Sequence, residues 1–103
     1  MMNQAQMLAQ VRKMQAEMTK AQEELASTVV SGHAGGDAVT VEMTCDFRVT
    51  SLRIAPEAID PDDRETLEDL VTVALNDVLA KVQETSGKRM SAVTGGMRIP
   101  GIG

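Results

Sequence analysis

The chain has 103 residues and a formal net charge of −5, which fits one small domain and is unfavourable for a protein that binds polyanions. Phe47 is the only aromatic residue, so a base-stacking surface for single-stranded nucleic acid is excluded. Cys45 is the only cysteine, and an intramolecular disulfide is therefore impossible. The sequence contains neither a signal-peptide pattern nor an apolar run near the roughly 20 residues of a membrane span, so we expect a cytoplasmic protein with no membrane partner.

The acidity is concentrated in one segment. Residues 56–69 hold seven acids against a single base, Arg64. The last eighteen residues are basic, with three positive charges at Lys88, Arg89 and Arg98. The net charge therefore does not exclude a positive surface elsewhere on the molecule.

Residues 3–27 have the pattern of one long helix. The apolar positions follow a heptad spacing and are Met7, Val11, Met14, Met18, Ala21 and Leu25. The residues between them are mostly Gln, Ala, Glu and Lys, which favour helix. A stripe this narrow favours a helix that lies against one partner helix, and an ordinary amphipathic surface helix is the alternative.

Three short strands are expected next. Residues 28–31 are rich in β-branched side chains, and the glycine-rich residues 32–37 are expected to connect them to the second strand. Residues 38–45 alternate apolar and polar, which predicts one buried and one wet face. Residues 48–54 form the third strand, in which Val49 is out of step with Leu52 and Ile54, so a bulge or an end effect is expected.

A second long helix follows a connector that can hold a helical turn. We expect Asp60 to be the N-cap and Pro61 the first helical residue. Asp62, Asp63 and Glu65 would then lie at the positive end of the helix dipole, a structural explanation that we prefer to a metal site.

The apolar period of this second helix continues past Gly87 to Val93, so we expect the helix to run through that glycine. Gly95 and Gly96 should then end it. We expect residues 1–96 to form a single domain and residues 97–103 a flexible tail.

The order helix, three strands, helix predicts an α+β fold with segregated elements. A three-stranded antiparallel sheet leaves edges and a face exposed, and a second copy of the chain could cover them. The expected dimer interface lies on the second strand and the last helix and comprises Val39, Val41, Met43, Leu67, Leu70, Val71, Ala74, Leu75 and Val78.

The sequence offers little for catalysis. His33 lies in the glycine-rich connection and is interpreted as a solvated loop histidine, while Cys45 is interpreted as a small buried thiol. We expect no enzyme, no metal, no cofactor and no small-molecule substrate. The function that remains is binding to the phosphates of duplex DNA through Lys and Arg side chains. Each of these side chains could equally be a solvated surface charge. They are Arg12, Lys13, Lys20, Lys81, Lys88, Arg89 and Arg98.

Several segments, in their order and spacing, resemble the YbaB/EbfC family of bacterial nucleoid-associated proteins along nearly the whole chain. They are residues 14–18, 21–26, 35–36, 39–41, 60–63, 66–71, 76–77 and 94–97, with Ala74, Lys88 and Met90. The resemblance implies a tweezer-like homodimer that binds DNA, contributes to nucleoid organisation and affects transcription. Relatives commonly carry Asn-Gly where this chain has residues 44–47, so a different hairpin turn is expected there. The alternative function is a protein-interaction module that pairs through the Met-rich first helix.

Overall fold

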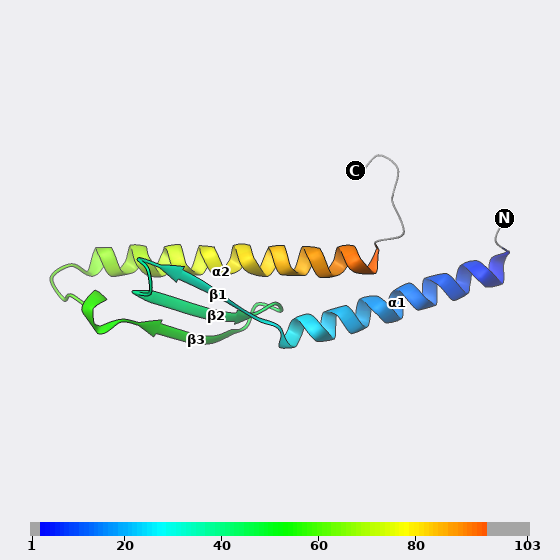
Figure 1. Ribbon diagram of the computed structural model, residues 1–103, viewed down its shortest axis with the longest axis horizontal. Helices are drawn as coiled ribbons and strands as arrows, with labels where there is room; N and C mark the ends of the chain where they lie inside the picture. Colours follow the sequence, from blue (N-terminus) through cyan, green and yellow to red (C-terminus); the bar gives the residue numbers. More distant parts are fainter. Residues whose placement is uncertain (1–2, 95–103) are drawn as a thin grey trace, which may run out of the picture.

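The computed structural model describes residues 3–94 and has an elongated α+β arrangement of two long helices and one antiparallel sheet (Figure 1), as predicted. The elements in chain order are α1 (Gln4–Ser27), β1 (Val29–Ala34), β2 (Val39–Thr44), β3 (Val49–Ile54), the 3-10 turn η1 (Pro56–Ala58) and α2 (Arg64–Val93).

The molecule has two layers. The strands lie in the order β1-β2-β3, and α2 packs along β1 and β2. Val39 and Val41 of β2 meet Val78 and Val82 of α2, and all four side chains are fully buried. The alternate residues of β2 face the other way, because successive side chains of a strand point to opposite faces. That second face of the sheet, which we call the outer face, has no helix of the described chain packed on it.

β1 is longer than the sequence suggested. It includes Gly32 and His33, and the turn that follows occupies only residues 35–38, with Gly35 and Gly36 at positive φ. A Cβ atom on Gly32 would lie 2.5 Å from the carbonyl oxygen of Ala74 in α2. The glycine therefore allows the helix backbone to approach the strand, which is a tertiary reason for a residue that looked like a loop signal.

The register of β3 contains the expected irregularity. Glu42 pairs with Ser51 and Met43 pairs with Val49, so Thr50 is left without a partner as a β-bulge. The bulge returns Val49 to the face that carries Leu52 and Ile54. This is the face on which α2 packs, but α2 does not reach over β3, and Val49 and Leu52 remain 55% and 52% exposed.

The hairpin between β2 and β3 closes without an Asn-Gly turn. The N–H of Thr44 donates to the carbonyl of Arg48, and Phe47 takes a positive φ of 67°. This is a three-residue loop with its last residue in the left-handed region. Thr44 was expected on the wet face, but it is 8% exposed because its hydroxyl bonds with Asp46 and with the N–H of Arg48.

α1 begins with a capping box, in which Asn3 and Gln6 each accept the backbone N–H of the other. The C-terminal half of its apolar seam packs towards α2, with Ala21 and Leu25 buried. The N-terminal half is different, because Met7 and Val11 are more than half exposed.

α2 starts later than predicted. Its N-cap is Asp63, which accepts the N–H and the hydroxyl of Thr66, while Asp60 instead accepts the N–H of Asp62. The N–H of Asp63 bonds to the carbonyl of Asp60, so Asp60 and Pro61 open a β-turn, for which these residue types are equally suited. Only Glu65 lies in the first turn of the helix.

The helix passes through Gly87, as predicted, and ends at Val93 with Thr94 as its C-cap. Gly95, Gly96 and the expected tail at 97–103 lie outside the described residues. The 3-10 turn of η1 confirms the helical turn expected in the connector.

Candidate nucleic-acid interface

The basic side chains of the described chain fall into two groups. Those of α2 are each paired with a carboxylate. The pairs are Arg64–Glu68 at 2.9 Å, Lys81–Asp77 at 3.3 Å, Lys88–Glu84 at 3.0 Å and Arg89–Glu24 at 2.8 Å. The basic side chains of α1, and those just before and within β3, make no ion pair with another described residue. They are Arg12, Lys13, Lys20, Arg48 and Arg53.

The Arg89–Glu24 pair joins the two helices. The Nε of Arg89 donates to the Glu24 carboxylate, and this hydrogen bond holds the pKa of Glu24 below its usual value. It also raises the pKa of Arg89, so both groups stay charged over the physiological range. Arg89, expected to contact phosphate, is therefore already bound to an acid of its own chain, and Lys88 is bound to Glu84 one turn away.

The three bases of α1 project from the side of the helix opposite its apolar seam. Lys13 and Lys20 are two helical turns apart and share one stripe, with Arg12 beside them. All three side chains are exposed. Arg12 and Lys13 flank the exposed N-terminal half of the seam, and Lys20 lies one turn before Glu24, the residue that pairs with Arg89 of α2.

Two arginines of the β-sheet region were not among the predicted phosphate contacts, all of which lay on the helices or the tail. Arg53 pairs with Thr40 of β2, and its side chain is exposed on the outer face. Arg48 lies between the hairpin turn and the first residue of the same strand and is also exposed. The alternation of Leu52, Arg53 and Ile54 was the available signal, because it places Arg53 opposite the apolar face.

The acidic cluster lies at the end of the molecule farthest from α1 (Figure 1). An open pocket there is lined by Pro61 and five charged residues, namely Asp62, Asp63, Arg64, Glu65 and Glu68. Among residues 3–94 there is no group of three side chains placed to hold a metal ion. This end of the chain is the least suited to phosphate, because its net charge is negative.

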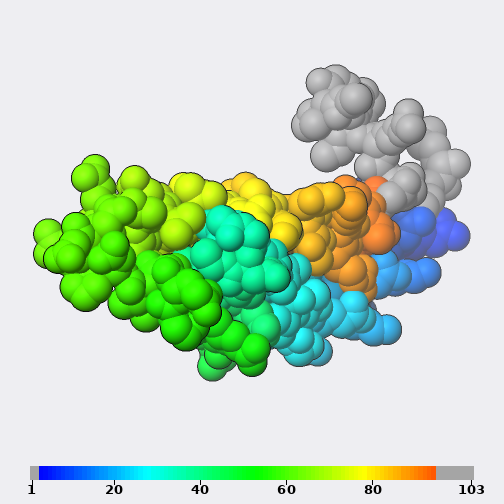
Figure 2. Space-filling view, turned by 60° about the vertical axis from the view of Figure 1, so that its left-hand side comes forward, coloured from blue at the N-terminus to red at the C-terminus, as the bar shows by residue number. Residues whose placement is uncertain are grey.

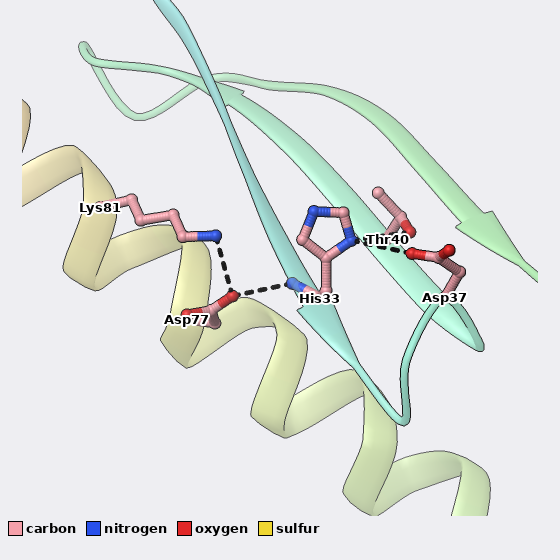
Figure 3. A network of polar contacts seen from close by, with 5 residues as sticks. All are labelled: His33, Asp37, Thr40, Asp77 and Lys81. Atoms are coloured by element: carbon pink, nitrogen blue, oxygen red, sulfur yellow. Dashed lines mark hydrogen bonds and ion pairs between the residues drawn. The ribbon is translucent and has the colours of Figure 1, made fainter.

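His33 lies on β1 and not in a loop. Its Nδ1 is 3.3 Å from the hydroxyl of Thr40 and 3.5 Å from a carboxylate oxygen of Asp37, while its backbone N–H donates to Asp77 (Figure 3). Asp77 also pairs with Lys81 (Figure 3). The contact with Asp77 holds the edge of β1 against α2, and the imidazole has as neighbours a hydroxyl and a carboxylate of its own hairpin. Cys45 is buried, as interpreted, and burial raises the pKa of its thiol, which makes it a poor nucleophile.

Most residues of the expected dimer interface lie inside the chain's own core. Val39, Val41, Met43, Ala74 and Val78 are buried between β2 and α2 of the same chain. Leu67, Leu70 and Val71 are half-buried against that core, and Leu75 is 37% exposed.

An exposed apolar surface remains beside them. It includes Val49 and Leu52 of β3, which are more than half exposed. Asp77 and Lys81 mark the flank of α2 that faces β1, so helical periodicity places Leu75 and Leu79 on the opposite flank, towards β3. We call this surface the β3 surface.

None of the helices within residues 3–94 is both long enough and apolar enough to cross a membrane.

The chain is similar to known proteins along nearly its whole length. Residues 1–97 match the YbaB/EbfC DNA-binding family. A nucleoid-associated protein of Chloroflexus aurantiacus is 48% identical over 97 residues, covering 94% of this chain and 97% of the relative. One from Roseiflexus sp. (strain RS-1) is 46% identical over 101 residues, covering 98% and 100%. The solved structure of an uncharacterized protein from Helicobacter pylori has a TM-score of 0.73 at 23% identity, covering 85% of this chain and 92% of that one, and shows the same fold.

The family match covers all the elements described above, and the family is one of DNA-binding proteins and not of enzymes. The paired helices, the small sheet and the exposed bases therefore belong to a member of the YbaB/EbfC DNA-binding family.

Proposed function

We propose that the protein binds duplex DNA as a homodimer, mainly through phosphate contacts, and contributes to nucleoid organisation and transcription regulation. The proposal of DNA binding rests on the stripe of Arg12, Lys13 and Lys20 on α1. These side chains are exposed and have no ion-pair partner among the described residues. A phosphate can meet these groups without first breaking an internal ion pair. The names of the relatives, all nucleoid-associated proteins, support the cellular setting.

The remaining bases of the proposed site are less favourably placed. Lys81, Lys88 and Arg89 would each have to share or release a carboxylate of the same chain before binding phosphate. Arg98 lies outside the described residues. We therefore rank the α1 bases first, and the α2 bases second.

A mobility-shift titration with a short DNA duplex at several salt concentrations tests this ranking. The affinity should fall steeply with salt, and Lys13→Ala with Lys20→Ala should weaken binding and flatten the salt dependence. The matched control, Lys81→Ala with Lys88→Ala, should change binding less. Absence of any shift at low salt and micromolar protein would overturn the DNA proposal. A larger effect of the control would place the site on α2 instead.

The homodimer is proposed on the β3 surface. The outer edge of β3 pairs with no other described strand, whereas β1 is held against α2 through Asp77. A second copy placed with its β3 against this edge would extend the sheet, cover Val49 and Leu52, and satisfy the edge amides. A two-fold arrangement uses the same surface on both copies, so the assembly closes at two.

Analytical ultracentrifugation tests the interface. Wild-type protein at tens of micromolar should sediment as a dimer, and Leu52→Glu should sediment as a monomer because a buried charge is costly. Val73→Glu is the matched control, since Val73 is 55% exposed on the flank of α2 away from β3. A monomeric wild type would refute the dimer. A monomeric Val73→Glu together with dimeric Leu52→Glu would move the interface to the other flank of α2.

One observation favours a second candidate function, a protein-interaction module. Met7, Leu8 and Val11 of α1 are 55%, 51% and 52% exposed, an apolar stripe that suits a partner helix. A stoichiometric protein that stays bound after nuclease treatment, and no longer binds Val11→Glu, would favour this function. Unchanged DNA binding by Val11→Glu would show that the stripe is not needed for DNA.

A further inference from the structure

The outer face of the sheet is a polar surface with no covering element among the described residues. Strand alternation and the registers of the sheet place on it Val29, Ser31 and His33 of β1, Thr40, Glu42 and Thr44 of β2, and Ser51 and Arg53 of β3, so that Val29 is its one apolar side chain. The side chains that face α2 are instead apolar or glycine on β1 and β2. In the space-filling view the strand residues, cyan to green, lie at the surface beside α2 (Figure 2).

We propose that this outer face is part of the DNA site, with Arg53 and Arg48 of the β3 region binding backbone phosphates of the same duplex that contacts α1. The inference rests on the proposed DNA binding and extends it from the helices to the sheet.

The first argument for phosphate binding at the outer face is the charge of its arginines. Arg48 and Arg53 are exposed and have no carboxylate partner within the described residues, unlike the four bases of α2. The acids at this face are the half-buried Glu42 of β2 and, in the turns at its two ends, Asp37 beside His33 and Asp46 in the loop of Arg48. Arginine can present two parallel N–H donors to a phosphate, and the hydroxyls of Thr40 and Ser51 beside Arg53 can donate to neighbouring phosphate oxygens.

The second argument is that the outer face adjoins the basic stripe of α1. The outer face looks away from α2, and the basic stripe of α1 lies off the apolar seam whose C-terminal half packs towards α2. The chain passes from α1 to β1 through Thr28 alone, which makes these two surfaces neighbours. The bases without an ion pair among the described residues therefore belong to α1 and the β3 region, and the four ion-paired bases belong to α2.

The absence of stacking groups decides the kind of nucleic acid. Phe47 is the only aromatic residue of the chain. The unpaired nucleobases of a single strand would therefore have no aromatic ring to stack on at this face. Duplex phosphates need only positive charge and hydrogen-bond donors.

The decisive experiment compares two matched arginine substitutions in the full chain. Arg53→Glu should weaken binding to a random-sequence duplex about tenfold at low salt, and the salt slope should fall by about one for each phosphate that is no longer bound. Arg64→Glu, an exposed arginine at the acidic end, makes the same change in charge and should have a much smaller effect. Arg48→Glu should behave like Arg53→Glu, and circular dichroism should show all three variants folded.

An NMR titration gives an independent readout with the wild-type protein. Addition of the duplex should shift the amide signals of Thr40, Ser51 and Arg53 more than those around Ala80 on the solvent side of α2. If the wild type binds and Arg53→Glu binds equally well, with unmoved sheet amides, the sheet proposal is overturned while the proposed function stands. If the wild type binds no duplex at any salt, both are overturned.

Discussion

Asp77 of α2 accepts the backbone N–H of His33 at 2.9 Å, so a helix side chain satisfies an outward-facing amide at the edge of β1. The same carboxylate pairs with Lys81 one turn further along α2. An unpaired strand edge is a template for another strand, and this contact occupies β1 at the position where the edge would otherwise accept one. The two edges of the sheet therefore differ, with β1 held by α2 and β3 open.

This contact should make stability depend on acid pH. The His33 N–H, and then Lys81, hold the pKa of Asp77 below its usual value of 3.8. A carboxyl group with a lowered pKa in the folded state adds stability above its unfolded pKa, and that stability disappears as the pH falls through the folded pKa. Urea denaturation at pH 7 and at pH 3 should therefore show a smaller acid destabilisation for Asp77→Asn than for the wild type. Equal destabilisation of both proteins would contradict the assignment.

Gly32→Ala should destabilise the fold strongly. The added methyl would meet backbone atoms of Ala74 and Val78, which cannot move aside as a flexible side chain could. We expect a decrease of about 3 kcal/mol in the free energy of unfolding, from overpacking. Denaturant titration measures this decrease, and a variant as stable as the wild type would show that α2 does not sit this close to β1.

Gly87→Ala is the opposite case. Gly87 lies in the interior of α2, and a Cβ there would have no atom within 4 Å. Alanine should raise stability by about 1 kcal/mol, because glycine is the poorer helix former. For a domain of this size the melting temperature should rise by about 4–8 °C. No rise would indicate that the helix is not continuous through this position.

Phe47→Gly should also stabilise the protein. Phe47 holds a φ of 67° and is 61% exposed, so the ring adds little packing to offset its backbone strain. A non-glycine residue in the left-handed region costs about 1–2 kcal/mol, part of which glycine gives back through its flexible unfolded state. We expect a net gain of about 0.5 kcal/mol or more. Phe47→Ala is the control, because it removes the ring but keeps the strain, and it should show no gain.

The sequence alone predicted the elements whose signals are local. The heptad seam defined α1, the alternation of residues 39–43 defined the buried face of β2, and the apolar period that continues past Gly87 defined the length of α2. These patterns are repeated over several residues, so no single contact could overturn them. Signals that rest on one or two residues were less reliable. Asp60 and Pro61 are suited to a β-turn as well as to the start of a helix, and Gly32 is suited to a loop as well as to the close approach of β1 and α2.

The tertiary structure decided which of the predicted residues remain available to a partner. Val39, Val41 and Val78 look suited to a dimer interface in the sequence, but packing of α2 on β2 uses them within one chain and leaves Val49 and Leu52 outside. Lys88 and Arg89 look like a basic terminus, but Glu84 and Glu24 neutralise them. Composition counts charges and apolar groups without regard to their neighbours, whereas burial and ion pairing depend on distances between segments that are far apart in the sequence.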